Sequence, residues 1–164
     1  MLFIYNAVRI FLYPFLFFVS LFNKKARTFF SKRLRVEKTE PGEYYWIHLS
    51  SVGEMNLSEK LIEKILSEKK KIYLTLITDT GMDLFKKRYS GNSDITGAYF
   101  PLDDYFLIKK TVNMLNIEKL IIIETEIWPN LYKIVSKKSD IIIVNGRISD
   151  KTFDKYKKLK GIIA

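Results

Sequence analysis

The sequence contains no cysteine and only one histidine, His48. The absence of cysteine excludes disulfide bonds, thiolate metal sites and cysteine nucleophiles, and a single histidine excludes a histidine-rich metal centre. A glycine-rich nucleotide fingerprint is also missing, as is the glycine and lysine spacing of a P-loop, so we expect no binding site for nucleoside triphosphates. The composition therefore favours chemistry that needs no metal ion.

Positive charge is concentrated near the N-terminus. The 164 residues carry a net charge of +10, and residues 1–40 hold eight Lys and Arg against two Glu. The rest of the chain is closer to balance, and its apolar content is ample for the core of one domain. We expect one globular domain with a basic N-terminal appendage.

The appendage, residues 1–36, reads as a hydrophobic membrane-anchor helix followed by a cluster of Lys and Arg, here called the basic collar. The collar consists of Lys24, Lys25, Arg27, Lys32, Arg33 and Arg35. The uninterrupted apolar run, residues 10–22, is shorter than the roughly 20 residues of a membrane span, and Arg9 at a bilayer centre would cost about 2.5 kcal/mol or more. A span and a shallow insertion in the membrane plane therefore both remain open.

Other interpretations of the appendage fit the sequence less well. A signal peptide would need a basic cluster before the apolar run and a small-residue cleavage site after it, and both are missing. A buried core helix is the remaining alternative. The collar suits the anionic lipids of an inner membrane leaflet, where each Lys or Arg is worth about 1 kcal/mol. No interleaving of aromatic and basic residues indicates a nucleic-acid partner.

A linker is expected over residues 37–44, where Pro41 and Gly42 interrupt any helix, and the globular domain over residues 45–164. Short apolar runs alternate there with helical patterns, which is typical of a doubly wound α/β fold with a parallel sheet. The predicted strands cover residues 44–50, 71–78, 95–101, 120–124 and 140–145. The predicted helices cover residues 55–69, 82–90, 104–116, 130–138 and 151–159.

Polar motifs follow four of these strands, and the carboxyl ends of parallel strands share one rim, where ligands bind. The motifs are WIHLSSVGEMN, TDTGMD, ETEIWPN and NGRISD. In the first, Glu54 follows Gly53, whose missing side chain allows close approach to the backbone. Glu54 is a candidate base. The competing interpretation is a capping box, in which Ser51 and Glu54 bond free amides at the start of a helix.

The other motifs supply further candidates, each with a structural alternative. Glu124 and Glu126 would point to the same side of an alternating strand, or could be solvated acids before a helix that starts at Pro129. The turn with Thr78 and Thr80 suits anions or sugar hydroxyls. Arg147, together with Asn145, suits a phosphate or a carboxylate, but it is also a plausible surface residue. His48 fits a core histidine better than an acid-base group.

Together the motifs resemble the N-terminal half of the Kdo transferases, enzymes that add 3-deoxy-D-manno-octulosonic acid (Kdo) to the lipid A precursor. The motifs that carry the resemblance are, in order, WIHLSSVGEMN, TDTG, YFPLDD, ETEIWPN and VNGRISDKTFDKY. The likeness covers almost the whole chain. One difference is that the family usually has a proline in the turn that reads TDTG here, with Asp79.

The resemblance implies the N-terminal Rossmann-like domain of an inverting GT-B glycosyltransferase on the cytoplasmic face of the bacterial inner membrane. Such an enzyme uses CMP-Kdo without a metal or other cofactor, and its N-terminal domain takes the lipid A precursor while a C-terminal domain holds the donor. It implies that Glu54 is the general base and that at least one of Glu124 and Glu126 orients the acceptor. Residues expected to line the same crevice are Ser51, Gly53, Thr78, Thr80 and Arg147.

The family continues into a donor-binding domain beyond the position of Ala164. We therefore expect the 164-residue chain alone to lack the donor site and to be inactive in transfer. The alternative from a different class is a non-catalytic, membrane-tethered module that binds a lipid or a sugar.

Overall fold

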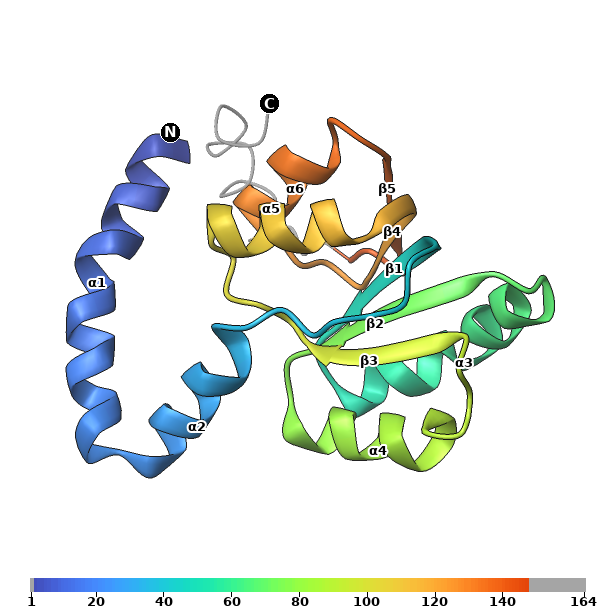
Figure 1. Cartoon of the computed structure of the whole chain (residues 1–164), viewed down its shortest axis with the longest axis horizontal. Helices are drawn as coiled ribbons and strands as arrows, with labels where there is room; N and C mark the ends of the chain where they lie inside the picture. Colours follow the sequence, from blue (N-terminus) through green and yellow to red (C-terminus); the bar gives the residue numbers. More distant parts are fainter. Residues whose placement is uncertain (1, 148–164) are drawn as a thin grey trace.

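A computed structural model describes residues 2–147, which form six helices and five strands (Figure 1). In chain order they are α1 (Leu2–Phe22), α2 (Lys24–Arg33), β1 (Glu43–Leu49), α3 (Val52–Ser67), β2 (Lys71–Leu76), α4 (Asp79–Tyr89), β3 (Ile95–Tyr99), α5 (Tyr105–Met114), β4 (Asn116–Ile123), α6 (Pro129–Val135) and β5 (Asp140–Val144). The helix predicted over residues 151–159 lies outside the described residues.

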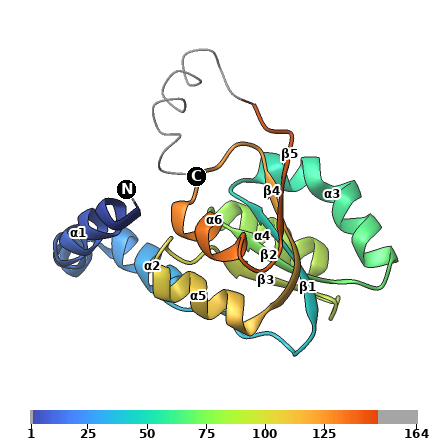
Figure 2. The same ribbon diagram turned by 90° about the horizontal axis from the view of Figure 1, so that it is seen from above.

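The five strands form one parallel sheet in the order β3-β2-β1-β4-β5. Helices cover both of its faces, as Figure 2 shows from above, with α3 and α4 on one side and α5 and α6 on the other. This is the predicted doubly wound, Rossmann-like α/β fold, and it is preceded by the predicted apolar helix. The winding reverses between β1 and β4, so the ligand crevice of such a sheet is expected at the carboxyl ends of these two strands.

Alternating side chains of the central strands divide the core into two halves. On β1, Ile47 and Leu49 pack with α3 and α4, whereas Trp46 packs with α5 and α6. Ile121 and Ile122 of β4 divide in the same way. Because successive strand residues point to opposite faces, a continuous apolar run is what a sheet covered on both sides requires.

The N-terminal appendage consists of two helices, because Asn23 is extended and its side chain caps α2 by accepting a hydrogen bond from the Ala26 amide. Figure 1 shows α1 along one side of the domain, with α2 turning back toward the sheet. Buried Arg33, at the end of α2, donates hydrogen bonds to the carbonyls of Phe29 and Ile77. Since Ile77 directly follows β2, the basic collar is held against the rim of the sheet.

Candidate active site

Three strand-to-helix turns meet at Ser50, directly after β1. The Ser50 carbonyl accepts a hydrogen bond from the Thr78 amide, at 3.1 Å, in the turn after β2. Its hydroxyl donates to Glu54 Oε1 at 2.6 Å and lies close enough to Glu126, which follows β4, to lower the pKa of that carboxyl. Because a hydroxyl carries one proton, it can donate to only one of the two carboxylates at a time. The predicted motifs on β2, β1 and β4 are thus brought together.

Glu54 lies in the first turn of α3 and is almost fully buried, at 6% exposed. Ser51 has an extended backbone and caps the helix, with its hydroxyl 3.5 Å from the Glu54 amide. The Glu54 carboxylate accepts hydrogen bonds from the Ser50 amide at 2.6 Å and from the Ser51 hydroxyl at 3.1 Å. The capping interpretation therefore describes the local geometry. It leaves a catalytic role open, because Oε2 accepts only the Ser50 amide and keeps a second lone pair.

Glu126 has the most elaborate surroundings of the predicted acids. Its Oε2 lies 2.7 Å from Nε2 of fully buried His48 and accepts a hydrogen bond from the Trp128 indole at 2.9 Å. Burial acts to raise the pKa of Glu126, but the hydrogen bond and charge of His48, with the bonds from Ser50 and Trp128, outweigh it and lower the pKa to about 2. Since an ionised carboxylate only accepts, His48 Nε2 carries the proton.

His48 is itself held from its other ring nitrogen. Nδ1 lies 3.0 Å from the Thr75 hydroxyl, which accepts a hydrogen bond from the Trp46 indole at 2.9 Å. The histidine is therefore a satisfied core residue, as expected, but its outer nitrogen faces the site. A buried chain of hydrogen bonds, Trp46–Thr75–His48–Glu126, fixes the carboxylate at the carboxyl end of β4.

Glu124 differs from Glu126, and the prediction that both acids point to the same side of a strand is wrong. Strand β4 ends at Ile123, and Glu124 has a left-handed backbone with φ of 65°, so strand alternation does not continue. The Glu124 amide bonds the Val144 carbonyl of β5 at 2.8 Å, and within residues 2–147 its carboxylate has no hydrogen-bond partner. Pro129 begins α6, as the sequence predicts.

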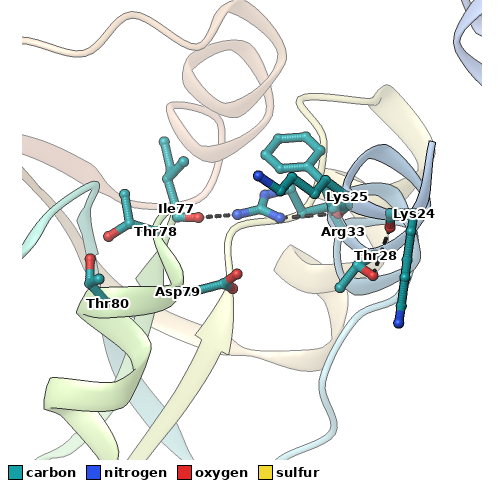
Figure 3. A pocket seen from close by; sticks show the side chains of 9 residues that line it. Lys24, Lys25, Thr28, Arg33, Ile77, Thr78, Asp79 and Thr80 are labelled. Carbon is teal, nitrogen blue, oxygen red and sulfur yellow. Dashed lines mark hydrogen bonds between the residues drawn. The ribbon is translucent and has the colours of Figure 1, made fainter. Parts of the chain in front are cut away.

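Two predicted residues lie on the β2 side of the site. The Thr78 hydroxyl caps α4 by accepting a hydrogen bond from the Gly81 amide at 3.2 Å, and Thr80 is exposed in the first turn of α4. Both line a pocket of about 860 Å³ whose opposite wall is α2, with Lys24, Lys25 and Thr28 (Figure 3). The pocket therefore joins the rim to the basic collar.

Asp79, in the turn after β2, strengthens this junction. Its Oδ1 accepts hydrogen bonds from Lys32 Nζ and from the Tyr99 hydroxyl, both at 2.7 Å. These bonds lower the pKa of Asp79. The residue thus ties the start of α4 to α2 and to the end of β3.

Gly53 and Arg147 lie at the outer parts of the rim. Gly53 is exposed, and a Cβ added there would meet only the Ser51 hydroxyl, at 3.7 Å, so the turn is open to approach. Arg147 is exposed, and its amide and carbonyl bond the Thr125 hydroxyl at 2.7 and 2.8 Å. Within the described residues, no hydrogen bond joins the side chain of Arg147 or Thr80 to Glu54.

Sequence reasoning did not select several residues that shape the site: Ser50, Thr75, Trp128 and Asp103. Ser50 stands in the SS pair of the first motif, but sequence alone favoured its neighbour Ser51 as the helix cap. Asp103 is buried in the YFPLDD motif and bonds the Asn130 and Leu131 amides at the start of α6, at 3.0 and 2.9 Å. Burial raises the pKa of Asp103 in spite of these bonds.

Within residues 2–147, no three His, Asp or Glu side chains converge where a metal ion could be held. The arrangement offers instead two carboxylates beside one serine, at the reversal point of the sheet. One is ionised and rigidly held, and the other lies at a helix start beside an open turn. Such a pair is suited to accepting a proton from a hydroxyl and to orienting the group that carries it.

Residues 24–164 match the family described as 3-deoxy-D-manno-octulosonic-acid transferase (kdotransferase). A protein of Haemophilus influenzae named 3-deoxy-D-manno-octulosonic acid transferase is 27% identical over 122 residues, which cover 74% of this chain and 29% of that protein. The protein of the same name from Rickettsia bellii is 29% identical over 118 residues, 71% of this chain and 28% of that protein.

A bifunctional glycosyltransferase/methyltransferase of Fusobacterium nucleatum subsp. nucleatum is 45% identical over 144 residues, 85% of this chain and 22% of that protein. The chain therefore spans only about a quarter of the length of the curated relatives that it matches. The family match nevertheless covers most of the chain, including every turn of the site described above. The chain belongs to the 3-deoxy-D-manno-octulosonic-acid transferase family, as its N-terminal region and one half of a GT-B fold.

Proposed function

We propose that the chain is the acceptor half of a glycosyltransferase that moves Kdo from CMP-Kdo to the lipid A precursor in lipopolysaccharide biosynthesis. The observation that carries the proposal is the pair of carboxylates, Glu54 and Glu126, beside Ser50: Glu54 accepts a hydrogen bond from its hydroxyl, and Ser50 lowers the pKa of Glu126. The pair lies at the carboxyl ends of β1 and β4, where a doubly wound sheet binds its ligand. The names of the relatives from Haemophilus influenzae and Rickettsia bellii support the choice of sugar.

In the proposed reaction, Glu54 is the general base. It removes the proton of an acceptor hydroxyl as the hydroxyl oxygen attacks the anomeric carbon of Kdo, a new C–O bond forms, and CMP leaves with the electrons of the broken bond. Attack from the face opposite CMP inverts the configuration. Glu54 must then lie within about 3 Å of the hydroxyl. A donor-binding domain closing over the crevice would exclude water and make the carboxylate a stronger base.

Glu126 is proposed to orient the acceptor. Its low pKa keeps it ionised, so it is suited to accepting hydrogen bonds and poorly suited to taking up a proton near neutral pH. The rigid support from His48 and Trp128 favours this positioning role. Glu124, which lacks such support, is the weaker candidate of the pair.

The pocket between α2 and α4 is proposed to receive anionic groups of the acceptor. Lys24, Lys25 and the first turn of α4 line it. Ammonium groups and the free amides at a helix start both favour phosphate. The carboxylate of Asp79 offsets part of this attraction, but Lys32 pairs with it at 2.7 Å.

We further propose attachment to the cytoplasmic face of the bacterial inner membrane. Helix α1 is long and apolar enough to cross a bilayer, and most of its large apolar side chains are exposed. The basic collar follows it directly, as expected for a segment that meets anionic lipid headgroups.

Replacing the base tests the reaction. In the enzyme that contains this chain, Glu54→Gln should lower Kdo transfer by about 10²- to 10⁴-fold, because the neutral amide cannot take up the proton. Glu63→Gln is the matched control, since Glu63 is an exposed acid on the same helix. The readout is initial rate of product formation, with circular dichroism to show that both variants fold. Normal turnover by a folded Glu54→Gln enzyme would reject the assigned role.

A membrane-tethered binding module without catalysis is the second candidate. The observation that favours it is the present bonding of Glu54, whose carboxylate already receives three hydrogen bonds from Ser50 and Ser51 as part of a helix cap. This candidate predicts that the chain binds the lipid A precursor without consuming CMP-Kdo. Absence of measurable affinity in a titration with the acceptor would remove it.

A further inference from the structure

Helix α1 faces the domain with a polar stripe. The stripe consists of Tyr5, Asn6, Arg9 and Tyr13, which fall within about 100° of helix rotation at 3.6 residues per turn. These side chains are partly buried, whereas most of the large apolar side chains of the helix are exposed. Their spacing therefore gives α1 one polar side, although its composition as a whole is apolar.

Each residue of the stripe bonds to the globular domain. The Tyr5 hydroxyl donates to Asp103 Oδ2 at 2.9 Å, and the Arg9 guanidinium pairs with Asp104 at 3.0 Å. The amides of Asn6 and Asn130 exchange two hydrogen bonds, at 3.0 and 2.9 Å. Tyr13 lies 3.5 Å from Asp104. The contacts hold α1 lengthwise along the domain, beside the loop before α5 and the start of α6 (Figure 1).

The partners of the stripe belong to the globular domain, and moving them into hydrocarbon would break the hydrogen bonds that they make at helix starts. Asp103 bonds the first amides of α6, and Asp104 caps α5 by accepting hydrogen bonds from the Phe106 and Leu107 amides. Both carboxylates therefore stabilise helix starts within the globular domain. The stretch of α1 bound to them must therefore stay outside the hydrocarbon core, at the same level relative to the membrane as the globular domain.

The rest of α1 is apolar and exposed. Its exposed large side chains are Phe3, Ile4, Val8, Ile10, Phe11, Leu12, Phe15, Phe17, Phe18, Leu21 and Phe22. Nothing else in the part of the chain that the structure describes covers them. A bilayer fits this surface because the basic collar continues from its end, so that lipid tails and anionic headgroups meet matching sides of one segment.

A bilayer span would place Arg9 near the hydrocarbon centre, at a cost of about 2.5 to 3.5 kcal/mol or more, and would break its ion pair with Asp104. Insertion in the membrane plane keeps every contact of the stripe and still buries the apolar side. We infer that α1 does not cross the membrane: it lies in the plane of the membrane surface, held there by its polar stripe against the domain. The inference rests on the membrane attachment proposed above but not on the transfer reaction.

Depth measurements on one side of the helix test this. The sequence has no cysteine, so single cysteines can be placed at Ile4, Phe11 and Phe18 without background. These positions share one side of α1 and are spread over about 21 Å of helix, at 1.5 Å per residue. Each variant of the chain is spin-labelled and bound to vesicles of phosphatidylethanolamine and phosphatidylglycerol, and the label's depth is measured from collisions with oxygen and with a nickel chelate.

Insertion in the plane predicts the same shallow depth for all three labels. A span predicts a graded profile, with the label at Phe11 deepest and the other two near opposite headgroup layers, and this result would overturn the inference while leaving attachment intact. Labels that all remain in water would overturn attachment and the inference together. A label at exposed Glu63 on α3 gives the aqueous reference. The depth measurement and the transfer assay are independent tests, so none of these outcomes decides whether the protein transfers Kdo.

Discussion

At the scale of single residues, Glu54 and Glu126 both lie beside Ser50, but different groups donate hydrogen bonds to their carboxylates. Glu126 receives hydrogen bonds from two buried or partly buried rings, those of His48 and Trp128. Glu54 is bonded by the Ser50 amide and by two serine hydroxyls at the start of a helix. Hydroxyl groups reorient more readily than packed rings, so Glu54 is the acid whose partners the hydroxyl of the proposed acceptor can replace.

The low pKa of Glu126 predicts a pH-dependent contribution to stability. A carboxyl whose pKa falls from 4.5 to about 2 on folding stabilises the native state above pH 4.5, and this contribution is lost as the pH falls toward 2. Glu126→Gln should therefore lower the free energy of unfolding at pH 7, on the order of 3 kcal/mol, and by much less at pH 3. Urea unfolding at both pH values measures the difference.

Glu63→Gln serves as the control for this experiment, because Glu63 is exposed and should show little difference at either pH. A destabilisation by Glu126→Gln that is the same at pH 7 and pH 3 would show that charge at this position does not contribute. The comparison between variant and parent removes the effect of other carboxyls that titrate in the same range.

At the scale of helices and strands, the sequence predicted the order and type of the described elements of the globular domain, while their ends depended on capping and pairing. It did not predict α2, the helix formed by the basic collar. Helix α3 begins at Val52, three residues before the apolar periodicity indicated, because Ser51 caps it. Strand β4 begins at Asn116, not Leu120, because polar residues such as Lys119 pair with β1 even though they bury little apolar surface. The periodicity of apolar residues indicates which side chains are buried, but it gives no information on which backbone segments pair in a sheet.

The start of α6 shows how a helix can depend on a distant residue. Trp128 at its N-cap makes no capping bond, and Asp103 supplies the acceptors instead. Asp103→Asn should lower the free energy of unfolding by about 1 to 3 kcal/mol, because one buried amide of α6 loses its acceptor. Asp94→Asn, at an exposed loop position, should change it by less than about 0.5 kcal/mol. Equal urea midpoints for the two variants would contradict this assignment.

At the scale of the whole molecule, α1 and α2 flank the rim of the sheet. Lys32 and Arg33 bind the turn after β2, and the stripe on α1 binds the loop before α5 and the start of α6. An apolar helix, a basic helix and the candidate site therefore lie on connected surfaces. Under the proposed function and membrane attachment, this arrangement would present the crevice to an acceptor whose lipid tails remain in the membrane.

The basic collar should contribute measurably to membrane binding. Lys24→Gln combined with Lys25→Gln should weaken binding to phosphatidylglycerol vesicles by about 30-fold, since each lysine near an anionic surface is worth about 1 kcal/mol. Lys86→Gln with Lys87→Gln is the matched control, an exposed neighbouring pair near the end of α4. Sedimentation with vesicles at low and high salt measures both. Similar weakening by the two pairs would mean that net charge, not position, determines binding.

The sequence by itself determined the α/β class, the apolar helix with its basic collar and the placement of polar motifs at strand ends, because these depend on local periodicity and on turn-forming residues. The tertiary structure alone decided that Glu126, not Glu124, joins Glu54 at Ser50, and that α1 presents a polar stripe to the domain. These outcomes depend on contacts such as His48 to Glu126 and Asn6 to Asn130, between residues 78 and 124 positions apart. No local pattern encodes such pairs, since they form only when the sheet and its helices have packed.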